Sequence, residues 1–161
     1  MNKLTLTRTG PGIFALADRL KELQKTDVLV GIPQEKNARK GEPIGNAALM
    51  YIHTHGSPAN NIPARPVIEP ALQAQPTKDL IAIELKQAGQ AIFNSDAVRA
   101  LQHLRKAGML GANAARQWFF DPRNNWLPLK PATIKAKHSS QPLIDTGALR
   151  GSLTYVVRQE K

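Results

Sequence analysis

The chain has 161 residues, 42% of them hydrophobic, which predicts a single domain over residues 1–161 with its own core and excludes a disordered protein. It contains no cysteine, which excludes a disulfide framework and thiolate catalysis and favours a reducing compartment. Nowhere do about eighteen apolar residues run together, so we expect no membrane partner. Of the net charge of +10, residues 105–161 supply +7, which is compatible with a nucleic-acid partner, an acidic protein partner or simple solubility.

The first elements alternate between strand and helix patterns. Residues 3–8 alternate as a short strand does, and residues 11–23 carry apolar side chains at helical spacing. A β-branched run closed by proline predicts a second strand over 26–33. A short helix over 47–55 is expected to end at Gly56, because glycine accepts the left-handed conformation that follows many helices.

The segment 34–46 is polar, basic and contains glycine, which predicts an exposed loop. We expect it to be mobile or to become ordered on a partner. Its basic residues Lys36, Arg39 and Lys40 are therefore candidates for contact with another protein.

Two long helices follow in the second half of the chain. The spacing predicts one helix over 77–93 with Ile81, Leu85, Ala88 and Ile92 on its inner face. The other is expected from an N-cap at Ser95 to about Phe119, with Gly108 and Gly111 allowing a kink or the close approach of another backbone.

The C-terminal part contains short elements and a final strand. Residues 132–137 predict one helical turn, and the β-branched run 152–159 predicts a strand. The aromatic residues Trp118, Phe119 and Trp126 are interpreted as core residues rather than a base-stacking platform. Together these elements predict an α+β fold, a small and mostly antiparallel sheet with two long helices packed against it.

We find no pattern that predicts a metal or cofactor site or a catalytic serine. His53 and His55 are candidate metal ligands. Side chains two positions apart on a helix point about 200° apart, however, so this spacing argues against joint binding of a metal. The glycine-rich stretch before residue 13 lacks the spacing of a phosphate-binding loop, and no serine lies in a nucleophile elbow. We therefore expect no cofactor and no metal.

Asp145, Thr146 and Gly147 match the motif around the catalytic carboxylate of retroviral-type aspartic proteases. In those proteases a flap hairpin and further strands follow the motif, whereas only 14 residues follow Gly147 here. The alternative is that Asp145 is the N-cap of a short helix over 146–153, where its carboxylate would accept backbone N–H bonds. The helix cap is the prediction we retain.

Three strings in this order resemble the tail-completion proteins of tailed bacteriophages, including the Mu-like virion-morphogenesis group. They are Ala64-Arg65-Pro66, then Pro128-Leu129 with Thr133 and Lys135, then the run Leu143 to Leu149. The resemblance spans about residues 26–158, and each string alone is weakly specific. The chain departs from the family at Thr54, because a glutamate and an aromatic residue often precede the glycine that corresponds to Gly56.

The resemblance implies a non-enzymatic structural protein at the head–tail joint, assembled in the bacterial cytoplasm and located in the neck of the virion. Its expected partners are the connector and the tail terminator or tube, its expected state is a ring of six copies, and DNA would pass through the lumen. An alternative from the charge distribution is a nucleic-acid-binding accessory protein that uses the basic C-terminal third.

Arg65 is the fourth candidate for an interface with another protein. Pro63 and Pro66 restrict the backbone on both sides of it, so its guanidinium would meet a neighbour's carboxylate in a fixed geometry. The alternative is that Arg65 binds carbonyl groups of its own chain. Both readings remain open at the level of the sequence.

Overall fold

The computed structural model describes residues 18, 21 and 25–159. The predicted strand over 3–8 and most of the predicted helix over 11–23 lie outside the described residues. Helices and strands follow in the order β1 (Thr26–Gly31), η1 (Gln34–Lys36), α2 (Asn46–His55), η2 (Pro58–Asn60), α3 (Ile68–Gln73), α4 (Thr77–Phe93), α5 (Ala97–Trp118), η3 (Pro122–Asn124), α6 (Pro131–Lys137), α7 (Ala148–Ser152) and β2 (Thr154–Gln159).

The two described strands, at opposite ends of the sequence, form one antiparallel sheet. Thr26 pairs with Gln159 and Gly31 pairs with Thr154. Between these ends the pairs are mostly β-branched or aromatic, as in Val28 opposite Val157, which suits a pleated and half-buried surface. Both strands were predicted, β1 within the run 26–33 and β2 within the run 152–159.

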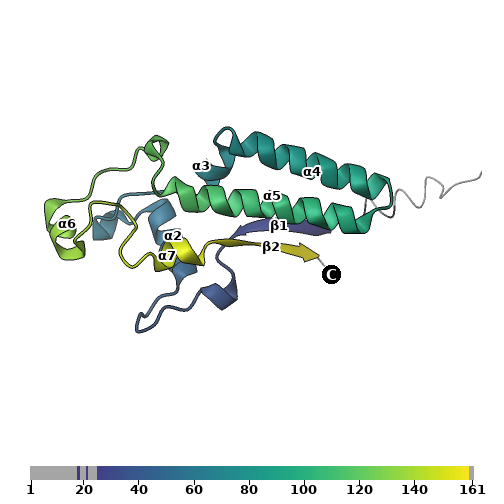
Figure 1. The fold of residues 1–161 in the computed structure, drawn as a ribbon. Coiled ribbons are helices and arrows are strands. Elements are labelled where there is room, and N and C mark those ends of the chain that lie inside the picture. The colour runs from purple at the N-terminus through teal and green to yellow at the C-terminus, as the bar shows by residue number, and fades with distance from the viewer. Residues whose placement is uncertain (1–17, 19–20, 22–24, 160–161) are drawn as a thin grey trace, which may run out of the picture.

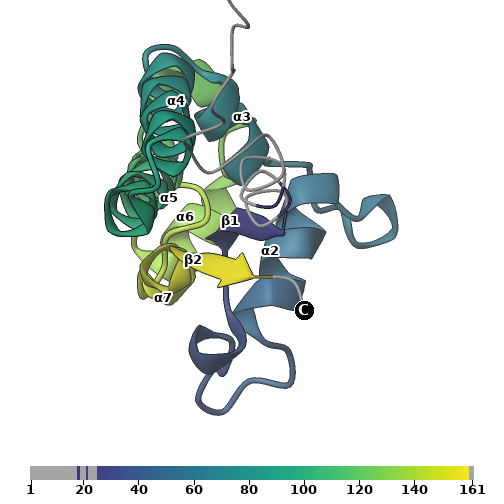
Figure 2. The ribbon, with the colours of Figure 1, turned by 90° about the vertical axis from the view of Figure 1, so that its right-hand side faces the viewer.

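The helices α4 and α5 form an antiparallel pair, and α5 lies along the sheet (Figures 1 and 2). This arrangement confirms the predicted α+β fold with a small antiparallel sheet and two long packed helices. The inner face of α4 was predicted partly wrong: Ala88 is buried as predicted, but Leu85 is 44% exposed, and Ala91, which was not predicted, is buried. Small side chains at the contact let the two helices approach closely, and the larger residues then lie at its edge or outside it.

Two glycines in α5 make room for neighbouring elements. A Cβ atom built on Gly108 would lie 2.3 Å from Cδ2 of Tyr155 on β2, and one on Gly111 would lie 2.9 Å from Val30 and Leu72 side chains. The neighbours at both glycines are side chains, so the close approach predicted there is found, but it is not made by another backbone.

The start of α5 differs from the prediction by one residue. Ser95 has a φ of +64°, and the N-cap is Asp96, whose carboxylate accepts a hydrogen bond of 2.9 Å from the backbone N–H of Arg99. Either side chain can cap a helix, and the backbone turn at Ser95 decides which one does. The helix α3 had not been predicted, because it has only six residues and contains Pro70.

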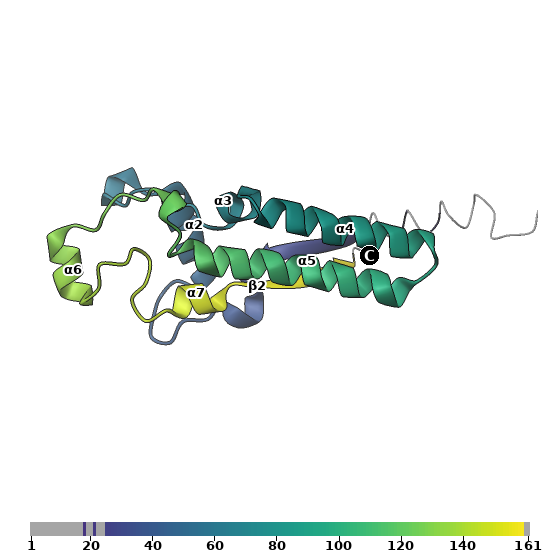
Figure 3. The ribbon, with the colours of Figure 1, turned by 45° about the horizontal axis from the view of Figure 1, so that its top comes forward.

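The short helices α2, α6 and α7 gather at one end of the molecule, beyond the end of the sheet where β1 leads out and β2 begins (Figures 1 and 3). The core reaches toward this end through Val67, Phe119 and Leu153, which are fully buried. Trp126 meets the ring of Phe119 edge-on at 6.1 Å, and Trp118 is buried, so the predicted core role of the aromatic residues is confirmed. In the described part of the chain, no helix is both long and apolar enough to span a membrane.

Candidate functional site

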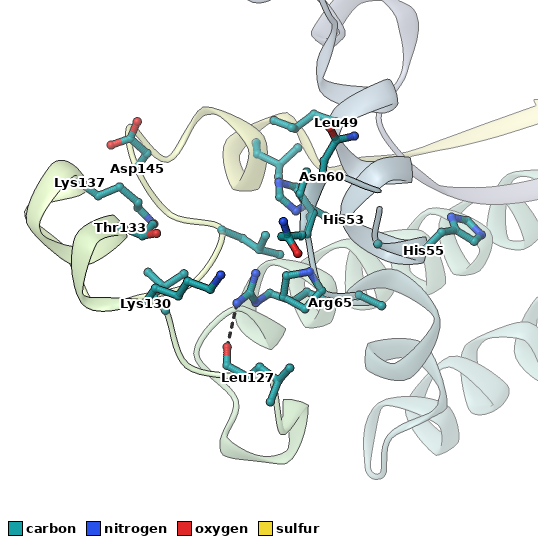
Figure 4. Close-up of a pocket in the computed structure, with 18 of the residues that line it drawn as sticks. Leu49, His53, His55, Asn60, Arg65, Leu127, Lys130, Thr133, Lys137 and Asp145 are labelled. Atoms are coloured by element: carbon teal, nitrogen blue, oxygen red, sulfur yellow. Dashed lines mark hydrogen bonds between the residues drawn. The ribbon is translucent and has the colours of Figure 1, made fainter. Parts of the chain in front are cut away.

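A pocket of about 1130 Å³ lies at the end of the molecule where α2, α6 and α7 meet (Figure 4). Its wall comes from segments far apart in the sequence, and apolar residues alternate in it with charged ones. Four basic side chains line it, Arg39, Arg65, Lys130 and Lys137, against the two acidic side chains Glu42 and Asp145. The apolar part of the wall includes Leu49, Ile62, Pro63, Leu127, Leu129, Leu143 and Leu149.

Arg65 is the most buried charged side chain of this wall, with 6% of its surface exposed. Its Nη2 donates a hydrogen bond of 2.8 Å to the carbonyl oxygen of Leu127 (Figure 4). Its Nε is buried without a hydrogen-bond partner, and no described carboxylate pairs with the guanidinium. Burial lowers the pKa of Arg65, but an arginine stays protonated in a protein, so the pocket holds a buried positive charge.

The backbone around Arg65 is fixed by its fold against α2. The N–H of Arg65 donates to the carbonyl oxygen of His53 at 2.6 Å. Gly56 ends α2 with a φ of +73°, and a Cβ there would lie 2.8 Å from the backbone nitrogen of Ala64. Glycine therefore serves two purposes at this position, because it accepts the left-handed turn and lets the returning segment pass close by. The predicted helix end at Gly56 is confirmed.

The opposite wall is α6 and the segment that follows it. Lys137 donates from Nζ to the carbonyl oxygen of Gln141 at 2.9 Å, and the side-chain amide of Gln141 donates to the carbonyl oxygen of Phe119. Burial lowers the pKa of Lys137, Asp145 raises it and Arg65 lowers it. Lys137 therefore interacts electrostatically with both the buried guanidinium of Arg65 and the carboxylate of Asp145.

His53 and His55 both line the pocket, but the imidazole of His53 lies near Arg65, whereas that of His55 is turned away from it (Figure 4). Burial lowers the pKa of His53, and the positive charges of Arg65 and Lys137 lower it further. A neutral imidazole is therefore favoured at neutral pH. His55 instead places its Nδ1 2.9 Å from the carbonyl oxygen of Tyr51. Within residues 25–159 and the two described residues before them, no group of three or more potential ligand side chains is arranged to hold a metal.

The prediction that Asp145 caps a helix is wrong. The helix α7 begins at Ala148, its N-cap is Gly147 with a φ of +80°, and no side chain makes the capping bond. Asp145 lies two residues before that cap, too early to reach the N–H groups of the first turn. The nearest substitute is the hydroxyl of Thr146, which accepts a 3.3 Å bond from the N–H of Ala148. Asp145 is exposed on the rim of the pocket instead.

The segment 34–46 has more structure than the predicted loop. Its first residues form η1, and its last residue, Asn46, is buried and begins α2. The side-chain oxygen of Asn37 accepts a hydrogen bond of 2.8 Å from the N–H of Ala47, which fixes the segment to the start of α2. Lys36 and Lys40 are exposed and stand apart from the pocket.

Arg39 is half-buried and belongs to the pocket wall, where its Nη1 lies 3.9 Å from a carboxylate oxygen of Glu42. Of the two sequence readings of Arg65, the structure contains the contact with a carbonyl of its own chain. The same side chain lines the pocket, so the alternative of a neighbour's carboxylate stays a prediction. The sequence had placed all four basic candidates on an interface without showing that two of them share one cavity.

The three strings that led to the phage resemblance meet at this pocket. Its wall contains Ala64 and Arg65 from the first, Pro128, Leu129 and Thr133 from the second, and Leu143, Asp145, Thr146, Gly147, Ala148 and Leu149 from the third. Their order is evident in the sequence, but nothing in the sequence indicates that they converge. Comparison of the chain with protein-family models, with curated proteins and with solved structures found no match.

Proposed function

We propose that this protein is a non-enzymatic structural subunit of the head–tail joint of a tailed bacteriophage. In this role it forms a ring in the neck of the virion, between the connector and the tail terminator or tube, with DNA passing through the lumen. The ring is proposed to contain six copies, as in the family that the three strings resemble.

The observation that supports the proposal is the convergence of the three strings on one pocket. They lie more than sixty residues apart at their extremes, since the first contains Ala64 and the last ends at Leu149. Strings that resembled a family by chance would have no reason to share a cavity in the fold. Their convergence indicates that they serve one common role, which the resemblance assigns to virion assembly.

The chemistry of the pocket favours binding over catalysis. An aspartic protease needs two carboxylates close enough to share a proton. Asp145 is exposed, and the carboxylate lining the same pocket, Glu42, lies beside Arg39. A buried guanidinium surrounded by leucine and proline is instead typical of a surface that receives another chain.

The test is to disrupt the gene in a phage genome and to examine the particles by electron microscopy. We expect DNA-filled heads and separate tails, and joined particles again when the protein is supplied from a plasmid. Antibody-gold labelling of complete virions should place the protein at the neck. Normal yields of infectious particles without the protein, or gold on the capsid or tail tip, would contradict the proposal.

The alternative function is nucleic-acid binding by the basic C-terminal third. Residues 105–161 carry ten Lys and Arg against three Asp and Glu, and Arg105, Lys106 and Lys135 are exposed. A DNA-binding protein would hold a duplex at physiological salt, with an affinity that falls steeply as salt is raised. Negligible affinity at physiological salt would exclude this alternative and leave the structural role.

A further inference from the structure

We infer that the pocket around Arg65 binds an acidic peptide segment of a different protein, with a carboxylate of that segment paired to the Arg65 guanidinium. The inference rests on the proposed function and names the kind of partner that the site takes. The carboxylate completes the hydrogen bonding of the arginine, and apolar side chains of the segment fill the rest of the pocket.

The state of Arg65 is the first reason. The side chain is 94% buried, yet within the described residues its hydrogen bonding is limited to the carbonyl oxygen of Leu127. Nε is buried without a partner, and Nη1 makes no hydrogen bond. A buried charge without a counter-ion is costly, and a guanidinium presents two parallel N–H donors that fit a carboxylate. A carboxylate entering the pocket therefore gains more here than at an exposed arginine.

The charge around Arg65 is the second reason. Arg65, Lys130 and Lys137 come from two sides of the pocket and are not paired with any carboxylate in the described chain (Figure 4). Asp145 on the rim is the one acidic side chain near Lys137 that affects its pKa. The cavity thus presents an excess of positive charge that an acidic segment complements.

The size and lining of the pocket favour a peptide over a small anion. Its volume of about 1130 Å³ exceeds the range of about 300–1,000 Å³ typical of small-molecule sites. Leu127 is 65% exposed at its edge, and Ile62, Leu129 and Leu143 line it further in. These surfaces suit a segment in which apolar residues flank the carboxylate.

The same geometry disfavours DNA and a second copy of this chain. Duplex DNA is a stiff rod that is usually held at its phosphates by exposed Lys and Arg side chains, whereas Arg65 lies in the wall of a pocket and has only 6% of its surface exposed. A second copy carries the same net charge of +10. A segment from a different, acidic protein is the better electrostatic complement.

The test uses the full-length protein and proton–nitrogen NMR. The probe is the peptide acetyl-Leu-Pro-Glu-Leu-Asp-Leu-amide, and its control is the neutral twin with Gln and Asn at the acidic positions. We expect saturable shifts of the Arg65 Nε–H and of pocket-lining amides with the acidic peptide, and binding at least about tenfold weaker with the twin. Inorganic phosphate and a short duplex DNA are titrated in parallel.

Three pocket variants and one control variant separate recognition from folding. Arg65→Met should weaken binding of the acidic peptide at least about tenfold, and its spectrum reports whether it remains folded. If that variant unfolds, Lys137→Gln and Asp145→Asn decide the question, because they change the pocket charge in opposite directions. Lys137→Gln should weaken binding several-fold and Asp145→Asn should strengthen it, whereas Lys86→Gln on exposed α4 should leave it unchanged.

Three results would each overturn the inference. They are equal binding of the two peptides, no saturable shift below about 10 mM peptide, and stronger binding of phosphate or DNA at the same residues. An equal effect of Lys86→Gln and Lys137→Gln would also overturn it, because net charge alone would then explain the binding. These outcomes are independent of where the protein lies in the virion. Neck labelling without peptide binding would reject the acidic segment alone, and peptide binding without neck labelling would reject the phage role alone.

Discussion

The packing of α5 on the sheet gives a sharp prediction for Gly108→Ala. The added methyl carbon would lie 2.3 Å from Cδ2, 2.7 Å from Cγ and 3.0 Å from Cβ of Tyr155. Carbon atoms pack at about 3.5–4.0 Å, and the crowded atoms include the Cβ next to the strand, so rotating the ring alone does not relieve the clash. Overpacking of this kind costs about 1–3 kcal/mol, and alanine returns about 0.5–1 kcal/mol through helix propensity. We expect a net loss of about 0.5–2 kcal/mol.

Gly89→Ala in α4 is the matched control, because nothing lies within 4 Å of a Cβ at that position. It makes the same chemical change in a helix interior and should stabilise the protein by about 0.5–1 kcal/mol. Thermal unfolding followed by circular dichroism should therefore place the two variants on opposite sides of the unchanged protein, several degrees apart.

A second measurement tests the cause of the loss. In a Tyr155→Ala background the ring contacts are absent and only the contact of 3.0 Å with the Cβ atom remains, so adding Gly108→Ala should cost that variant less stability than it costs the parent. A Gly108→Ala protein that melts at or above the parent temperature would refute the reasoning about this contact. An equal loss in the Tyr155→Ala background would show that the ring of Tyr155 does not cause it.

Three further predictions concern Asp145, Asp121 and the segment 34–46. Asp145→Ala should change the free energy of unfolding by less than about 0.5 kcal/mol in a melt, since Asp145 is no cap; a loss of about 1 kcal/mol would restore the capping role. Hydrogen bonds from Arg123 lower the pKa of Asp121 from 3.8 to about 2, so the stability it adds is present above pH 3.8 and is lost as the pH falls through about 2. Asp121→Asn should accordingly melt lower than the parent at pH 7 and approach it near pH 2, and a constant difference would contradict the pairing. If the segment 34–46 grips a neighbouring ring, limited proteolysis with trypsin should cut it in the isolated protein and spare it in assembled particles, and equal cutting would remove it from the interface.

The sequence by itself determined the elements whose signals are local. The helix α4 runs from Thr77 to Phe93 as its spacing predicted, and β1 and β2 coincide with the two β-branched runs. Hydrophobic periodicity and β-branched runs involve residues that are close together in the chain, so a single sequence is enough to predict these elements. The helix end at Gly56 was predicted for the same reason, whereas the sequence did not indicate that side chains rather than a backbone approach Gly108 and Gly111.

The tertiary structure decided which side chains meet. Spacing placed Leu85 on the inner face of α4, but the close packing of alanines between α4 and α5 left it 44% exposed. The sequence predicted Asp145 as a helix cap, but the left-handed turn at Gly147 makes α7 begin at Ala148, beyond the reach of that carboxylate. The buried guanidinium of Arg65 and the cavity around it arise from segments far apart in the chain, and a side chain's burial depends on distant neighbours that local pattern does not specify.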